Sequence, residues 1–157
     1  MKYSVIVPVY NRPDEVDELL ESLCSQTFKD FEAIIVEDGS QKPCKDVCDK
    51  YASILDLHYY LKNNSGPGQS RNYGVERAHG EYVIILDSDV VLPTTYLEAT
   101  DKSLTSYLYR RMGWSRCSPS IVYPRAEGHQ LFHDLFLYHG WHPRRKGQAR
   151  QVLSSLI

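Results

Sequence analysis

The stretch Gly66–Val90, GPGQSRNYGVERAHGEYVIILDSDV, indicates a turn, a helix and a buried strand in succession. Glycine and proline mark the turn, and a helix is predicted over Gln69–Ala78, with Gly80 as its stop. Tyr82–Leu86 is an apolar run of strand length that ends at an acidic segment. A helix that leads into a strand apolar on both faces is typical of a parallel sheet with crossover helices.

The residues before this stretch show the same alternation of strands and helices. Strands are predicted at Tyr3–Tyr10, Phe31–Val36 and Leu57–Leu61, with helices at Asp14–Gln26 and Pro43–Ser53 between them. Right-handed crossovers of this kind build an α/β fold. The fold class predicted is therefore a mostly parallel, Rossmann-like sheet flanked by helices.

Each predicted strand is followed by a polar cluster. The clusters read PVYNR, EDGS, NNSGPGQSRN and DSD in chain order. In parallel α/β sheets ligands bind beyond the carboxyl ends of the strands, where loops and helix N-termini meet. We therefore expect the four clusters to form one ligand site.

The acidic residues of these clusters suggest two kinds of contact. Asp87 and Asp89 have the spacing at which two carboxylates leaving a strand point into one pocket, and such oxygens suit Mg2+ or Mn2+. The alternative is a pair of solvated acids at a strand end. Asp38 can accept hydrogen bonds from a base edge or ribose hydroxyls, or it can cap a helix.

The remaining polar residues of the clusters fit a phosphate and a nucleoside. Gly66 and Gly68 allow close backbone approach, and Arg71 is expected in the first turn of the helix that follows them. Amide groups with one guanidinium form a diphosphate contact, although GPG alone is only a turn. Tyr10 and Arg12 are placed to flank a nucleotide, or Tyr10 caps the sheet.

The charge of the chain reverses along its length. Residues 1–105 carry 10 Lys and Arg against 18 Asp and Glu, whereas residues 106–157 carry 8 against 2. A basic tail for nucleic acid or anionic lipid is one interpretation. The apolar runs are too short to span a bilayer. The four cysteines, without a secretory leader, fit a reduced compartment. Their spacing is not that of a zinc site.

The motifs VIVPVYNR, VEDGS and GPGQSRNYGVERAHGEYVIILDSDV, in this order, resemble the N-terminal nucleotide-sugar half of family 2 glycosyltransferases of the GT-A fold. The resemblance covers about residues 1–100. It implies transfer of a sugar from a nucleoside-diphosphate donor, with uridine as the expected base and Mg2+ or Mn2+ as the metal. It also implies roles for six residues: Pro8, Tyr10 and Asp38 around the base and ribose, Arg71 near the base or diphosphate, Asp87 near the ribose, and Asp89 on the metal.

The family also implies a general base, which lies in its C-terminal half, commonly in a Glu-Asp pair. Residues 106–157 contain only Glu127 and Asp134 and no such pair, so no catalytic residue is assigned. If the codons are read one base later with suitable wobble bases, the segment from His129 can yield a continuation that resembles bacterial members of the family. We therefore expect a nucleotide-sugar-binding region at 1–105, incomplete at its C-terminus, and an atypical tail at 106–157 outside the ancestral reading frame.

The function expected from the resemblance is a truncated glycosyltransferase in surface polysaccharide or lipopolysaccharide assembly. A nucleotide-sugar-binding fragment without transfer activity is the alternative. The chain lacks the Gly-rich signature expected for nucleotidyl transfer. The net negative charge of residues 1–105 argues against a nucleic-acid module. The partners expected are a nucleotide-sugar donor and a saccharide or lipid-linked acceptor, with no nucleic acid. The location expected is the cytoplasm, with peripheral association at the inner face of the membrane left open.

Overall fold

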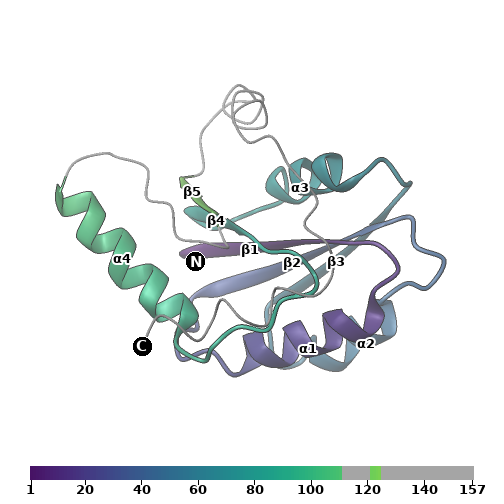
Figure 1. Ribbon diagram of the computed structural model, residues 1–157, viewed down its shortest axis with the longest axis horizontal. Coiled ribbons are helices and arrows are strands. Elements are labelled where there is room, and N and C mark those ends of the chain that lie inside the picture. Colours follow the sequence, from purple (N-terminus) through teal and green to yellow (C-terminus); the bar gives the residue numbers. More distant parts are fainter. Residues whose placement is uncertain (111–120, 125–157) are drawn as a thin grey trace, which may run out of the picture. The chain divides into compact units, whose positions relative to one another are not determined.

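A computed structural model of the chain describes residues 1–110 and 121–124. Strands and helices alternate through most of this range (Figure 1). Their bounds are β1 (Tyr3–Val9), α1 (Pro13–Cys24), β2 (Phe31–Asp38), α2 (Lys45–Tyr51), β3 (Leu57–Lys62), α3 (Pro67–Val75), β4 (Tyr82–Ile85), α4 (Tyr96–Arg110) and β5 (Ile121–Pro124).

The strands form one sheet in the order β3-β2-β1-β4-β5. β1 pairs in parallel with both β2 and β4, and β3 pairs in parallel with β2. β5 is antiparallel to β4 and lies at the edge. The predicted parallel α/β sheet is confirmed, with an antiparallel edge strand in addition.

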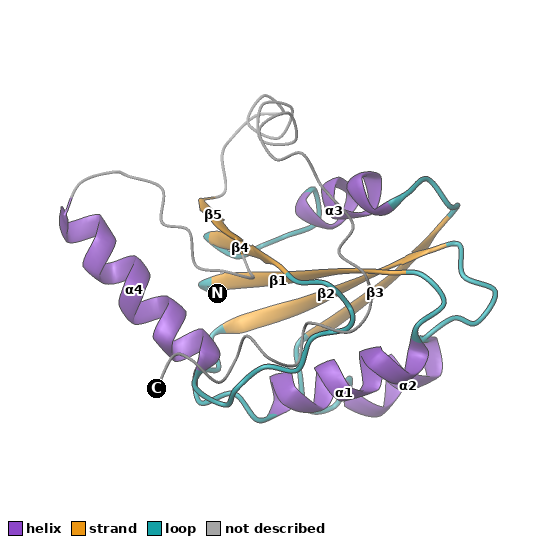
Figure 2. Cartoon of the chain, in the orientation of Figure 1, coloured by secondary structure: helices purple, strands orange, loops and turns teal. Residues whose placement is uncertain are grey.

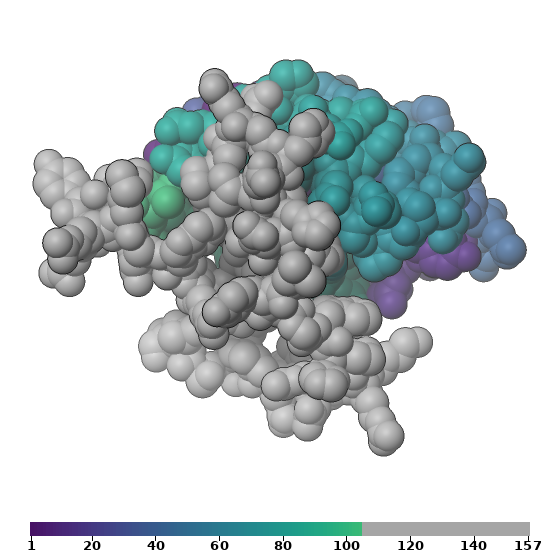
Figure 3. Space-filling view, turned by 90° about the horizontal axis from the view of Figure 1, so that it is seen from above, coloured from purple at the N-terminus to yellow at the C-terminus, as the bar shows by residue number. Residues whose placement is uncertain are grey.

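Helices cover both faces of the sheet (Figure 2). Alternate strand residues point to opposite faces, so Val5, Val7 and Ile35 pack on the face that carries α1, while Ile6 and Ile34 pack on the face that carries α3. Figure 3 looks onto the α3 side, where teal residues form much of the described surface. β1 and β2 thus bury both of their faces, as their two-sided apolar runs predict.

The hydrophobic core between α1 and the sheet forms as the sequence of α1 predicts. Pro13 occupies the first turn, where its missing amide hydrogen costs nothing, and two acidic residues follow it. Val16, Leu19, Leu20 and Leu23 recur at helical spacing and are fully buried. This apolar stripe fixes the helix on the sheet beneath the loop that links β1 to α1.

Two details differ from the expectations. α3 begins at Pro67, two residues before the predicted start, so Arg71 lies in its second turn and not in its first. α4 and β5 have no counterpart among the predicted elements. The boundary expected at residue 105 lies within the residue range of α4, which runs to Arg110, and it stays a prediction. Residues 111–120 and 125–157 of the predicted tail lie outside the described residues.

Within the described ranges, no helix has both the length and the apolar composition that crossing a membrane requires.

Candidate functional site

The predicted site residues lie at the carboxyl ends of the parallel strands. Pro8 is in the last part of β1, and Tyr10 follows that strand with 49% of its surface exposed. Asp38 is the last residue of β2. Asp87 and Asp89 follow β4. Because β1 to β4 run parallel, these ends share one edge of the sheet (Figure 1).

A hydrogen-bond network joins the loops that follow β1 and β2. The Asn11 side-chain oxygen accepts hydrogen bonds from the backbone amides of Gln41 at 2.7 Å and Lys42 at 3.0 Å. The Asn11 amide donates to Ser40 Oγ at 2.7 Å, and that hydroxyl donates to the buried Glu37 carboxylate. Asn11 has φ 55°, a conformation that asparagine tolerates better than most residues. The network fixes the position of the Tyr10–Arg12 loop.

Asp38 anchors the loop between β3 and α3. Its carboxylate pairs with Lys62, its Oδ1 also accepts from the Ser65 amide at 2.9 Å, and its Oδ2 accepts from the Gly66 amide at 2.8 Å. Gly66 has φ 90°, which glycine adopts without strain, and it directly precedes α3. Asp38 therefore does not cap α2, the helix that follows its own strand. Its predicted contact with base or ribose stays a prediction.

The environment of Asp38 stabilises its charged form. Burial alone would raise the pKa of this carboxyl group. The hydrogen bonds from Lys62 and from the amides of Ser65 and Gly66 outweigh burial and lower the pKa below its usual value. Asp38 is thus a buried anion that holds the start of α3 in place.

Each carboxylate of the DSD segment is paired with an arginine, one from the loop after β1 and one from α3. Asp87 Oδ1 accepts a hydrogen bond from Arg71 Nη2 at 3.1 Å, and Asp89 Oδ2 accepts one from Arg12 Nη1 at 3.2 Å. The side chains of Asp87 and Asp89 remain 65% and 54% exposed. The site therefore brings two acids and two guanidinium groups together at its surface.

The donor set at Asp87 and Asp89 fits a hard divalent cation. Both side chains are exposed carboxylates on one short segment after β4. Mg2+ and Mn2+ prefer oxygen ligands and commonly combine one or two carboxylates with water and substrate phosphates. Asp89, with Asp87 beside it, could hold such an ion.

Sequence reasoning missed several residues that position the site. Lys62 was not expected to pair with Asp38, nor Arg12 with Asp89. The polar ends of β2 and β3 were the available signal, because parallel neighbours of similar length end at the same edge. Glu127 and Asp134, the only acids of the tail, lie outside the described residues.

A parallel sheet with polar residues at the carboxyl ends of its strands is the architecture of α/β proteins that bind their ligands at that end. The family model described as "Glycosyl transferase family 2" matches residues 4–109. The chain belongs to glycosyl transferase family 2. This finding confirms the predicted resemblance.

Two relatives illustrate the similarity in sequence. The chain is 43% identical over 93 residues to the poly(ribitol-phosphate) beta-N-acetylglucosaminyltransferase TarS of Staphylococcus aureus, with 57% of this chain and 16% of TarS covered. It is 41% identical over 88 residues to an uncharacterized glycosyltransferase of Rickettsia felis, with 56% of this chain and 15% of the relative covered. The chain thus spans about one sixth of the length of these relatives.

Solved structures show the same fold. The crystal structure of S. aureus TarS 1-349 in complex with UDP-GlcNAc matches with a TM-score of 0.64 and 36% identity, over 68% of this chain and 32% of that one. The mannosyltransferase PcManGT of Pyrobaculum calidifontis, in complex with GDP-Man and Mn2+, matches with a TM-score of 0.55 and 26% identity, over 59% of this chain and 28% of that one. The predicted GT-A fold class is confirmed.

The role of Asp38 in stability predicts a pH-dependent effect of Asp38→Asn. At pH 7 the variant should lose about 2–4 kcal/mol of unfolding free energy, because Lys62 loses its buried charged partner. The folded-state pKa of Asp38 is depressed, so the carboxylate stabilises the fold above its unfolded pKa of about 3.9 and ceases to do so as pH falls through the folded pKa. Urea unfolding should show that the difference in unfolding free energy between the variant and the unmodified chain decreases below about pH 4.

The exposed Glu18 gives the matched control for this experiment. Glu18→Gln should change the unfolding free energy by less than about 0.5 kcal/mol at both pH values. A deficit in Asp38→Asn that is the same at pH 7 and pH 3 would contradict the assigned role.

Proposed function

We propose that the site at the carboxyl ends of β1 to β4 binds a nucleoside-diphosphate sugar, UDP-linked, together with Mg2+ or Mn2+. The observation that carries the proposal is the pairing of Asp87 with Arg71 and of Asp89 with Arg12. Two exposed acids with two partly exposed guanidinium groups supply the charges that a metal diphosphate requires. The complexes of TarS with UDP-GlcNAc and of PcManGT with GDP-Man and Mn2+ support this assignment.

In this proposal, different residues of the chain contact different parts of the donor. Pro8, Tyr10 and Asp38 surround the base and ribose, Asp87 lies near the ribose, and Asp89 is the protein ligand to the metal. A bound divalent ion neutralises charge on the leaving diphosphate. Arg71, released from its acid, contacts the base or diphosphate. Tyr10 is exposed and belongs to the loop that the Asn11 network fixes, so it can cover a base without reorganising the strand.

We further propose that the sugar is transferred to a saccharide or lipid-linked acceptor in surface polymer assembly. The similarity to a poly(ribitol-phosphate) glycosyltransferase supports an acceptor of this class. Surface polysaccharide and lipopolysaccharide are the acceptors expected from the sequence. In this proposal the reaction takes place in the cytoplasm, with peripheral association at the inner face of the membrane. Release of UDP from a UDP-sugar that depends on an added acceptor distinguishes transfer from donor binding alone.

The boundary near residue 105 is also a proposal. We infer that residues 1–105 form the nucleotide-sugar-binding region and that residues 106–157 are read outside the ancestral frame. The reversal of charge at this point and the end of the family match at residue 109 support it. Sequencing the coding DNA should show the family continuation in the next frame, and wobble bases that spell no such segment would contradict it.

Asp89→Asn should remove the metal-dependent part of UDP binding and leave the fold intact, since the side chain is exposed at a loop. Calorimetry with UDP, with and without Mn2+, should show at least a tenfold loss of affinity in the presence of Mn2+, about 1.4 kcal/mol, and little change without it. Glu18→Gln is the control and should bind as the unmodified chain does. Unchanged Mn2+-dependent affinity in Asp89→Asn would remove Asp89 from the site.

A further inference from the structure

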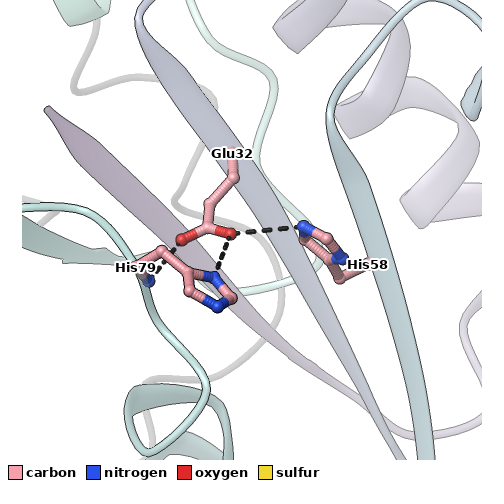
Figure 4. A group of neighbouring side chains, drawn as sticks. All are labelled: Glu32, His58 and His79. Carbon is pink, nitrogen blue, oxygen red and sulfur yellow. Dashed lines mark hydrogen bonds and ion pairs between the residues drawn. The ribbon is translucent and has the colours of Figure 1, made fainter. Parts of the chain in front are cut away.

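A second polar cluster lies on the α3 face of the sheet, at its amino end (Figure 4). Glu32, near the start of β2, is 1% exposed and lies between two histidines. Its Oε2 is 3.3 Å from His58 Nε2 and 3.1 Å from His79 Nδ1. His58 is near the start of β3, and His79 lies between α3 and β4. This cluster is at the opposite end of the strands from Asp87 and Asp89.

The other oxygen of Glu32 is held by the surrounding fold. Glu32 Oε1 accepts hydrogen bonds from Ser4 Oγ at 2.5 Å and from the His79 amide at 2.6 Å. These contacts satisfy one side of the carboxylate and fix its plane. Oε2 is left to face the two imidazole rings. A buried carboxylate oriented in this way by non-ligand groups is what a metal-binding carboxylate requires.

The position of His79 is fixed by the backbone next to it. Gly80 donates its amide hydrogen to Ser4 Oγ at 2.8 Å. A Cβ at Gly80 would lie 2.6 Å from the backbone nitrogen of Ser4, so only glycine permits this approach. The turn before β4 therefore lies directly against β1, and this contact places the His79 ring beside Glu32.

The three side chains have the chemistry and spacing of a zinc site. Their ligand atoms lie within 4.8 Å of one another. In a tetrahedral zinc site with bonds of roughly 2.0–2.1 Å, neighbouring ligand atoms are about 3.3 Å apart. The two distances from Glu32 Oε2, 3.1 and 3.3 Å, are close to this value. Two imidazole nitrogens with one carboxylate oxygen suit zinc, whereas Mg2+ prefers oxygen ligands.

We propose that Glu32, His58 and His79 bind one Zn2+ ion at the amino end of the sheet, at a site separate from the one proposed for the sugar donor. The rings of His58 and His79 are 36% and 69% exposed, so the ion can enter from solvent and a water can complete its coordination. Asp56 Oδ1, 3.2 Å from the same His58 nitrogen, can accept a hydrogen bond from that water.

The consequence of binding is structural. The three ligands come from β2, β3 and the α3–β4 connection, so one ion links β2 and β3, at one side of the sheet, to the segment that enters β4. A ligand that binds the folded chain and not the unfolded chain raises its stability. The zinc site would therefore stabilise the amino end of the sheet without touching the donor site, and it does not depend on the proposed function.

The test uses Co2+ as a spectroscopic probe for zinc on the full chain freed of metal. We expect one equivalent of Co2+ to produce visible d–d absorption without thiolate charge-transfer bands, and Zn2+ to displace it. His58→Gln and His79→Gln should each weaken Co2+ binding at least tenfold and abolish the rise in melting temperature that Zn2+ causes. Circular dichroism establishes that both variants fold.

Two matched controls separate this site from others on the chain. Glu18→Gln removes an exposed carboxylate on α1, which covers the opposite face of the sheet, and Asp89→Asn removes the proposed Mg2+ or Mn2+ ligand; both should bind Co2+ as the unmodified chain does. In the unmodified chain, Zn2+ should shift the ring nitrogen resonances of His58 and His79. Equal Co2+ affinity in all variants, thiolate charge-transfer bands, or no binding to the unmodified chain would each overturn the proposal.

Discussion

Parallel pairing of β1 with both β2 and β4 is the constraint on which the rest of the structure depends. Because β1 to β4 share one direction, every loop that leaves one of these strands emerges at the same end of the sheet. The polar segments after β1, β2, β3 and β4 are far apart in sequence and meet there. The same pairing brings the strand starts together at the opposite edge, where Glu32 meets two histidines. Two sites of different chemistry thus follow from one topology.

Ion pairs between acidic and basic side chains organise the carboxyl ends of the strands. Asp38 is buried and is paired within the fold, so it positions the loop that opens α3. Asp87 and Asp89 are exposed and are paired with arginines from α3 and from the loop after β1. Exposed ion pairs contribute little to stability, so a metal or a diphosphate can exchange for them at small cost. This difference in burial separates the acid that holds the site together from the acids available to a ligand.

Much of the fold could be predicted from sequence because its signals are local. The strands β1 to β4 and the helices α1 to α3 were predicted at nearly their observed bounds, since apolar runs and Gly or Pro boundaries lie within each segment. β5 could not be predicted, because its antiparallel pairing with β4 depends on the return path of the chain. α4 also lacked a strong local signal, since polar residues interrupt its apolar positions.

The site residues also fall into those that local sequence signals predict and those that depend on long-range contacts. The DSD segment and Asp38 directly follow apolar strands, and strand ends can be recognised in sequence. The contacts of Glu32 with His79 join residues 47 positions apart, and no spacing rule connects them. Lys62 and Arg12 likewise acquire partners only when strands and loops are aligned in space. Long-range contacts between single residues carry no periodic signal, and for this reason sequence reasoning missed them.

The central claim is that the carboxyl ends of the strands form the metal and donor site. Paramagnetic broadening of amide resonances by Mn2+ in the presence of UDP tests it most directly, because the effect reports distance from the ion. The account predicts that the amides of Asp87, Ser88 and Asp89 broaden first and that those around Glu32 and His79 remain sharp at low Mn2+. Broadening centred on Glu32 and His79, or spread evenly over the sheet, would contradict it.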